Sequence, residues 1–205
     1  HEHHGNRVSQ GASDNRVLIG CSRRFDQIIT VNQPLQAWAT KHLKCKKVTY
    51  LPNFVQVPSS VPSQSEREDV MVCLANLRQP KNHLLLIQAF HQVQAQFPNW
   101  RLQLIGGWKD DSYFEQLNHY IKTNNLGNFV ALMGAQSEVD GYLSKAKIGV
   151  LSSDMEGLPM ALLEYGASGL AVLVTDVGQC REVVANHGVV VPASELETYA
   201  EAMQS

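Results

Sequence analysis

The sequence predicts an α/β fold built on a doubly wound parallel sheet. From about residue 69 onward, short apolar runs of strand length alternate with amphipathic stretches of helix length. Strands that are apolar along nearly their whole length are typical of parallel sheets covered by helices on both faces. Ligands of such sheets bind at the carboxyl ends of the strands, so we expect functional residues in the loops that follow strands.

The positions of the strands and helices follow from these patterns. We expect strands at residues 70–75, 101–105, 128–132, 148–151, 171–174 and 188–191. We expect helices at residues 83–96, 113–124, 138–145, 159–168 and 179–186. The earlier part of the chain predicts a strand at 27–31, a helix at 34–43 and a strand at 48–51, while 16–25 fits either a strand or a helix.

Composition sets the broad class of the protein. With 205 residues, 44% of them hydrophobic and 18% charged, the chain can form one large domain, or one domain plus a fragment. No apolar run approaches the ~20 residues of a membrane-spanning helix, and we expect no secretory signal. The four cysteines are scattered without C-x-x-C spacing, which favours neither disulfides nor a metal site and suits a cytoplasmic protein.

A charge boundary lies near residue 50. Residues 1–50 carry eight Lys or Arg against three Asp or Glu, whereas residues 51–205 carry nine against sixteen. A solvated surface is the ordinary explanation for the basic part, and contact with an acidic partner or with an anionic membrane, at its inner face, is the alternative. Residues 56–65 contain Pro58, Pro62 and four serines, a composition typical of a linker.

The most informative stretch is Glu156-Gly-Leu-Pro-Met-Ala-Leu-Leu-Glu164, which follows an apolar run and a short polar turn. Pro159 suits the start of a helix, where free backbone amides of Gly157, Leu158 and the next turn can hold phosphate. Two carboxylates would repel an anion there unless they accept hydrogen bonds from hydroxyl groups. A nucleotide sugar, which carries both phosphates and hydroxyls, satisfies both demands.

This stretch also carries a family resemblance. The Glu156-x7-Glu164 pair across a Gly-Leu-Pro helix start, its continuation Tyr-Gly-Ala-Ser-Gly-Leu-Ala-Val, and Thr175-Asp-Val-Gly-Gln-Cys-Arg-Glu-Val-Val184 resemble the retaining GT-B glycosyltransferases of family four, also called glycosyl transferases group 1. The resemblance covers most of residues 50–205. It implies that Glu156 faces the donor sugar and that Glu164 holds the ribose hydroxyls.

The resemblance also implies a domain organisation. Residues 69–205 would form the Rossmann-like, donor-binding C-terminal half of a GT-B fold, and residues 51–68 would form the hinge and linker. Residues 1–50 are too few for a domain of this type, so we interpret them as the tail of a larger N-terminal acceptor domain.

Three further loops contain candidate donor-binding residues. After the first strand of residues 69–205, Arg78 and Lys81 form a cation pair that suits a diphosphate, although two ordinary surface charges are the alternative. The family usually has a Gly-Arg pair some five residues before this lysine. Ala75 and Asn76 stand there instead, so Lys81 carries over, Asn76 departs from the pattern, and Arg78 is the candidate to compensate.

Glycines mark the next two loops. Gly106 and Gly107 would let the backbone approach a ligand, and the following Trp108 excludes the G-x-G-x-x-G pattern of dinucleotide-binding dehydrogenases. Trp108 itself could cover the base or cap the surface. Met133 and Gly134 match the family's short turn, whose backbone groups meet the edge of the nucleobase.

Together these features predict a retaining, metal-independent glycosyltransferase that moves a sugar from a nucleotide-diphosphate donor to an acceptor, in polysaccharide or glycolipid synthesis. We expect Glu156 and Lys81 to be catalytic. The expected donor-binding residues are Arg78, Asn76, Gly106, Gly107, Met133, Gly134, Gly157, Leu158, Pro159 and Glu164. No metal, other cofactor or nucleic acid is expected. The acceptor would be a sugar, lipid or polysaccharide, held largely by the N-terminal domain, which also offers a peripheral membrane contact.

Because acceptor contacts would lie in that domain, we expect this chain alone to bind nucleotide without transferring sugar. Two alternatives stay open. One is a nucleotide-sugar epimerase on a similar two-domain scaffold. The other is a non-catalytic nucleotide-sugar-binding module, for which Asn76 in place of the usual arginine is the indication.

Overall fold

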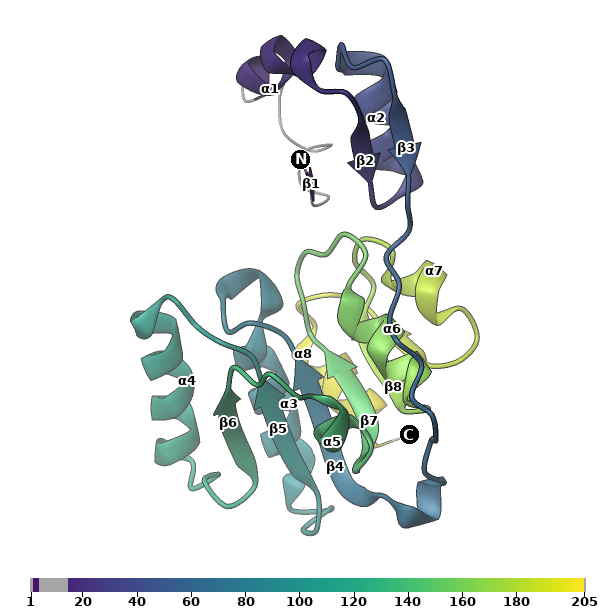
Figure 1. Ribbon diagram of the computed structural model, residues 1–205. Coiled ribbons are helices and arrows are strands. Elements are labelled where there is room, and N and C mark those ends of the chain that lie inside the picture. Colours follow the sequence, from purple (N-terminus) through teal and green to yellow (C-terminus); the bar gives the residue numbers. More distant parts are fainter. Residues whose placement is uncertain (1, 4–14, 205) are drawn as a thin grey trace. The chain divides into compact units, whose positions relative to one another are not determined.

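The computed structural model describes residues 2–3 and 15–204 (Figure 1). The chain divides into two compact units, residues 1–54 and residues 55–205. The division falls inside the 51–68 segment that the sequence suggested as hinge and linker. That the first unit belongs to a larger N-terminal domain stays a prediction.

The first unit contains a parallel three-stranded sheet of order β1-β2-β3. Its strands are β1 (Glu2–His3), β2 (Ile28–Thr30) and β3 (Val48–Tyr50), and its helices are α1 (Arg16–Cys21), the 3₁₀ helix η2 (Ser22–Arg24) and α2 (Gln33–His42). The ambiguous segment 16–25 is therefore largely helical. Helix α2 begins where the Asn32 side chain accepts a hydrogen bond from the Leu35 N–H at 2.8 Å.

The second unit contains six parallel strands in the order β6-β5-β4-β7-β8-β9. Its strands are β4 (Glu68–Leu74), β5 (Arg101–Ile105), β6 (Val130–Gly134), β7 (Ala146–Leu151), β8 (Ala171–Thr175) and β9 (Val189–Val191). Its helices are η3 (Gln64–Glu66), η4 (Gln79–Lys81), α3 (His83–Gln94), α4 (Asp111–Thr123), α5 (Asp140–Leu143), α6 (Met160–Ala167), α7 (Cys180–Val184) and α8 (Leu196–Ala202). The predicted doubly wound parallel fold is confirmed.

The strand order creates one topological switch point. The chain enters at β4 in the middle of the sheet, moves outward to β5 and β6, and then returns to the other side of β4 for β7, β8 and β9. Helices α5 and α6 lie in front of the sheet in Figure 1, and α3 and α8 lie behind it. The loops after β4 and β7 leave neighbouring strands in opposite directions, which is where such sheets form a ligand crevice.

Some predicted bounds were wrong for local reasons. Helix α4 starts two residues earlier than expected, because the Asp110 carboxylate accepts hydrogen bonds from the N–H groups of Ser112 (3.0 Å) and Tyr113 (3.4 Å). Helix α7 ends early because Ala185 adopts a positive φ of 48°. Helix α8 was not predicted at all, yet its Tyr199 is fully buried.

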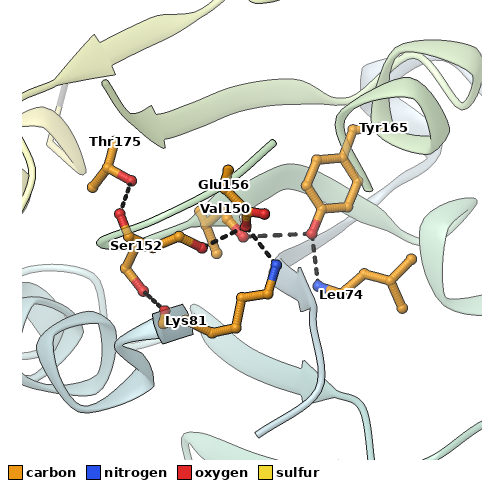
Figure 2. A network of polar contacts seen from close by, with 8 residues as sticks. Leu74, Lys81, Val150, Ser152, Glu156, Tyr165 and Thr175 are labelled. Atoms are coloured by element: carbon orange, nitrogen blue, oxygen red, sulfur yellow. Dashed lines mark hydrogen bonds and ion pairs between the residues drawn. The ribbon is translucent and has the colours of Figure 1, made fainter. Parts of the chain in front are cut away.

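Tyr165 of α6 joins the two central strands at the switch point. Its ring packs on Gly149, where an added Cβ would lie 2.4 Å from the ring atoms. Its hydroxyl accepts a hydrogen bond from the Leu74 N–H at 2.7 Å and donates to the Val150 carbonyl at 3.4 Å (Figure 2). The start of α6 is thereby held beside the carboxyl ends of β4 and β7.

Arg67 fixes the segment that leads into the second unit. Its side chain is 5% exposed, and all of its hydrogen-bond acceptors in the described part of the chain are backbone carbonyls. The guanidinium donates to Leu143 (2.9 Å), Ala146 (2.7 Å) and Ser168 (2.6 Å), and also to Pro62. One side chain therefore links three segments: its own stretch with Pro62, residues 143–146, and the end of α6 at Ser168. In the described residues, no helix is long and apolar enough to cross a membrane.

We predict that Arg67→Met lowers the free energy of unfolding by about 3 kcal/mol, because several buried carbonyls lose a charged donor together. Chemical denaturation of both proteins measures the difference. Lys122→Met, at an exposed position on α4, is the matched control and should change stability by less than ~0.5 kcal/mol. Similar losses in both variants would contradict the role of Arg67.

Candidate functional site

A cavity of about 380 Å³ lies at the carboxyl ends of β4, β5 and β7. Eight of the twelve predicted site residues line it: Asn76, Arg78, Lys81, Gly106, Gly107, Glu156, Pro159 and Glu164. The remaining lining residues are Leu74, Ala75, Ile105, Ala135, Gln136, Val139, Leu151, Met160 and Ala161. The cavity is therefore built at the switch point that the strand order creates.

An ion pair joins the two loops of the switch point. Lys81, at the end of η4, places its ammonium 2.5 Å from Oε1 of Glu156, in the β7–α6 loop (Figure 2). Their side chains are only 16% and 7% exposed. The Ser153 hydroxyl donates to the same oxygen at 2.7 Å. Glu156 is thus a largely buried carboxylate whose charge is balanced by Lys81.

Several hydrogen bonds fix the loop that carries Lys81. The Asp154 N–H donates to the Pro80 carbonyl at 2.9 Å, and the Asn82 side chain donates to the Asp154 carboxylate at 2.9 Å. Asn82 has a left-handed conformation, with φ 47°, and its side chain caps helix α3. The two loops therefore hold each other in place through backbone and side-chain contacts.

Glu164 lies on α6 and differs from Glu156 in its surroundings. It is half-buried, and its carboxylate makes no hydrogen bond or ion pair with any other described residue. Burial raises the pKa of this carboxyl, and the negative charge of Asp140 adds to the effect. A half-buried carboxylate without a donor is suited to accept hydrogen bonds from a ligand's hydroxyl groups.

The start of α6 differs in detail from the expectation. Pro159 is the residue before the helix and lines the cavity, whereas Gly157 and Leu158 do not line it. The Gly157 carbonyl instead accepts a hydrogen bond from the Gln179 N–H at 3.0 Å. An added Cβ at Gly178 would lie 2.3 Å from the Glu156 carbonyl oxygen, so this loop packs closely against the segment that precedes α7.

The predicted glycine loop after β5 forms the opposite wall. A Cβ at Gly106 would lie 2.1 Å from the Ala75 carbonyl oxygen, so only glycine fits at this position. Asn76, which replaces the family's usual arginine, accepts a hydrogen bond from the Gly107 N–H at 3.1 Å. Asn76 therefore connects the β4 and β5 loops in this structure.

The predicted base-binding turn lies beside the cavity. Met133 and Gly134 end β6 and are not among the lining residues, whereas Ala135 and Gln136 are. The Met133 carbonyl accepts a hydrogen bond from the Gln136 side chain at 2.7 Å, and the Gly134 carbonyl accepts one from the Gly106 N–H at 2.9 Å. Sequence reasoning missed Gln136, although its position directly after a strand was a usable signal.

Trp108 does not line this cavity. Its ring stacks on Phe114, with ring centroids 4.1 Å apart, and its indole N–H donates to Asp111 at 3.2 Å. These contacts agree with the interpretation of Trp108 as a surface cap.

In the described residues, no group of three or more His, Cys, Asp or Glu side chains is placed to hold a metal ion.

His83 is buried behind the site at the first residue of α3. Its side chain is fully inaccessible, and neither ring nitrogen has a hydrogen-bond partner of ordinary geometry among the described residues. The pKa of this imidazole is lowered from 6.5 to about 4, mainly by burial and in smaller part by the charge of nearby Lys81, while the Ala75 carbonyl partly opposes the shift. His83 is therefore neutral at ordinary pH, and the site does not gain a second buried positive charge beside Lys81.

The second unit matches a known protein family. The family model described as glycosyl transferases group 1 matches residues 59–205. The chain belongs to this family. The predicted GT-B relationship is thus confirmed, and the matched region contains the whole cavity of this group 1 glycosyltransferase chain.

Curated relatives are longer than this chain. An exopolysaccharide phosphotransferase of Streptomyces coelicolor is 24% identical over 98% of this chain and 21% of the relative. An uncharacterized glycosyltransferase of Methanocaldococcus jannaschii is 32% identical over 52% and 26%, and the mannosyltransferase WbdA of Escherichia coli is 22% identical over 83% and 24%. The chain thus spans about a fifth to a quarter of the length of these relatives.

Solved structures share the fold. HepE of Anabaena, in complex with UDP, has a TM-score of 0.79 at 18% identity, over 99% of this chain and 60% of that one. A TarM variant of S. aureus, in complex with fondaparinux, alpha-GlcNAc-glycerol and UDP, has a TM-score of 0.78 at 17% identity, over 98% and 41%. At these identities the likeness establishes the Rossmann-like GT-B architecture.

We predict that acid destabilises this chain through His83. An unfolded chain binds a proton at this imidazole below pH ~6.5, whereas the folded chain does so only near pH 4, so stability is lost as pH falls between these values. The contribution lost at pH 5 is about 2 kcal/mol. Urea unfolding at pH 7 and pH 5 measures it. His83→Gln should remove this part of the pH dependence, whereas His119→Gln should keep it; equal pH dependence in all three proteins would refute the assignment.

Proposed function

We propose that this chain is the donor-binding part of a retaining, metal-independent glycosyltransferase that uses a nucleotide-diphosphate sugar, in polysaccharide or glycolipid synthesis. The observation that carries the proposal is a single cavity of about 380 Å³ that presents Lys81 together with Glu156 and Glu164. A cation suits phosphate, and the carboxylates suit hydroxyl groups. Membership of the group 1 family supports sugar transfer as the reaction.

The diphosphate would bind Lys81 and Arg78. The Arg78 side chain is exposed, lines the cavity and forms no ion pair with a described residue, so its guanidinium is available to two phosphate oxygens. Lys81 would exchange part of its contact with Glu156 for the phosphate. As the bond to the sugar breaks, negative charge grows on the departing diphosphate, and these cations would stabilise it in place of a metal ion.

The two carboxylates would contact different parts of the nucleotide sugar. The Glu164 carboxylate is half-buried, and no described residue donates a hydrogen bond to it, so it would accept hydrogen bonds from the ribose hydroxyls. Glu156, held beside Lys81, would face the sugar and orient it. These roles leave no cavity residue as a dedicated general base, which is compatible with a reaction in which orientation and charge stabilisation supply most of the catalysis.

The acceptor would be a sugar, lipid or polysaccharide, bound largely outside the second unit. The names of relatives support this setting: they include a poly(glycerol-phosphate) alpha-glucosyltransferase of Bacillus subtilis and the O-antigen biosynthesis glycosyltransferase WbnH of Escherichia coli. We include in the proposal a cytoplasmic location and a peripheral contact of the basic first unit with an anionic membrane surface.

Phosphotransfer is a second candidate, because the relative from Streptomyces coelicolor is described as an exopolysaccharide phosphotransferase. A diphosphate site with hydroxyl acceptors would serve either reaction. The products separate the two: transfer of the sugar alone leaves a nucleoside diphosphate, whereas transfer of a sugar phosphate leaves a nucleoside monophosphate.

We predict that Glu164→Ala weakens binding of nucleoside diphosphates tenfold to a hundredfold, since losing a charged hydrogen bond costs about 1.5 to 3 kcal/mol. Isothermal calorimetry measures the change. Because the pKa of Glu164 is raised, affinity should also fall as pH drops through that raised value, and Glu164→Gln should lack this part of the pH dependence. Unchanged affinity in Glu164→Ala would exclude a ribose contact.

We predict that Lys81→Ala reduces affinity for a nucleoside diphosphate at least tenfold while changing affinity for the nucleoside little, because the lost contact is to phosphate. Added salt should narrow the difference between the two ligands. Lys109→Ala is the matched control, since Lys109 does not line this cavity. Equal binding of nucleoside and nucleoside diphosphate by the unmutated chain would show that no diphosphate site exists here.

A further inference from the structure

Three buried hydroxyl groups surround the Lys81–Glu156 ion pair. They belong to Ser152 and Ser153, directly after β7, and to Thr175, at the end of β8, and each side chain is at most 1% exposed. Each hydroxyl makes a specific hydrogen bond near the pair, and Figure 2 labels Ser152 and Thr175 beside Lys81 and Glu156. Buried hydroxyls with fixed partners orient the groups they contact.

The two serines act on opposite members of the ion pair. The Ser153 hydroxyl donates to Oε1 of Glu156 at 2.7 Å. The Ser152 hydroxyl lies 3.1 Å from the Lys81 carbonyl and 3.0 Å from the Asn82 carbonyl, so it holds the backbone that carries Lys81. Adjacent residues in the sequence therefore serve the carboxylate and the cation separately.

The two oxygens of Glu156 have different environments. Oε1 accepts from both the Lys81 ammonium and the Ser153 hydroxyl, whereas no described residue donates to Oε2. A carboxylate oxygen that already has two donors is poorly placed to accept a third from a ligand. Oε2 is therefore the oxygen that would accept a hydrogen bond from a hydroxyl group of the nucleotide sugar.

Thr175 extends this support to the sheet. Its hydroxyl donates to the Ser153 carbonyl at 2.6 Å, and its side chain is fully buried in β8. The backbone of Ser153 is thereby attached to a strand rather than to a free loop. A continuous series of contacts runs from β8 through Ser153 to the carboxylate.

We propose that Ser153 is a positioning residue that keeps Oε2 of Glu156 directed at the donor sugar when Lys81 turns towards the diphosphate. The inference rests on the proposed function, because it requires a donor substrate that carries both a diphosphate and a sugar. Once phosphate draws on the Lys81 ammonium, Ser153 is the remaining donor that holds Oε1. Without that hydroxyl, the carboxylate rotates, and the contact with the sugar is lost although the diphosphate contact persists.

The test compares a nucleoside diphosphate with the corresponding nucleotide sugar, by calorimetry on the unmutated chain and its variants. A panel of nucleotides first identifies the pair that binds. The ratio of the two affinities isolates the contribution of the sugar. Ser153→Ala should reduce nucleotide-sugar affinity about fivefold to tenfold and change nucleoside diphosphate affinity less than about twofold. The loss is smaller than for a direct charged hydrogen bond because Ser153 acts on the sugar only through Glu156.

Ser152→Ala is the matched comparison and should weaken binding of both ligands to a similar extent, through the diphosphate that they share, so that the ratio of the two affinities stays unchanged. Glu156→Gln should remove the same sugar contribution as Ser153→Ala, and the double variant should lose no more than Glu156→Gln alone. Thr175→Val keeps the shape of the side chain and removes its hydroxyl. It should reduce nucleotide-sugar affinity selectively, by less than Ser153→Ala does. Thermal unfolding verifies that each variant is folded.

Equal losses for both ligands in Ser153→Ala and Thr175→Val would assign these hydroxyls a purely structural role and overturn the inference. An additive loss in the double variant would overturn it as well. Failure of the proposed function is visible elsewhere, in the unmutated chain, as binding of neither ligand or as the absence of any sugar contribution.

Discussion

The site depends on one buried ion pair between loops that are far apart in the sequence. Lys81 and Glu156 are 75 positions apart in the sequence. They meet at 2.5 Å because β4 and β7, the strands that precede their loops, are neighbours in the sheet. Each charge on its own would be costly to bury. Together they allow a polar cavity at the carboxyl ends of strands that are otherwise largely apolar.

The surrounding packing keeps this pair in register. Tyr165 joins the backbone of Leu74 to that of Val150, and Gly149 leaves the space for its ring. Gly106 lets the next loop approach the Ala75 carbonyl. Changes at these positions would act on the site without touching a ligand, because they alter the distance between strands that carry the charged residues.

The sequence predicted the parts of this arrangement that depend on pattern. Apolar runs located the strands, and Pro159 located the start of α6 to within one residue. The sequence did not predict that Glu156 and Lys81 share an ion pair, because that contact depends on strand order. It also missed α8, a short helix whose Tyr199 is buried by tertiary contacts, and Gln136, whose neutral side chain has no distinctive chemistry. Asn76 departs from the family motif in the sequence, whereas in the structure its side chain accepts a hydrogen bond from the Gly107 N–H.

Helix α8 has a consequence for where this domain can be cut. The Tyr199 hydroxyl lies 3.0 Å from the carbonyl of Leu151, the last residue of β7, and Ser194 donates to the Asp154 carboxylate at 2.8 Å. The segment after the last strand thus supports the loop that carries Glu156. A fragment that ended at residue 191 would keep all six strands and every residue of the family motif. It would lose the two hydrogen bonds that hold the end of β7 and the following loop beside the cavity.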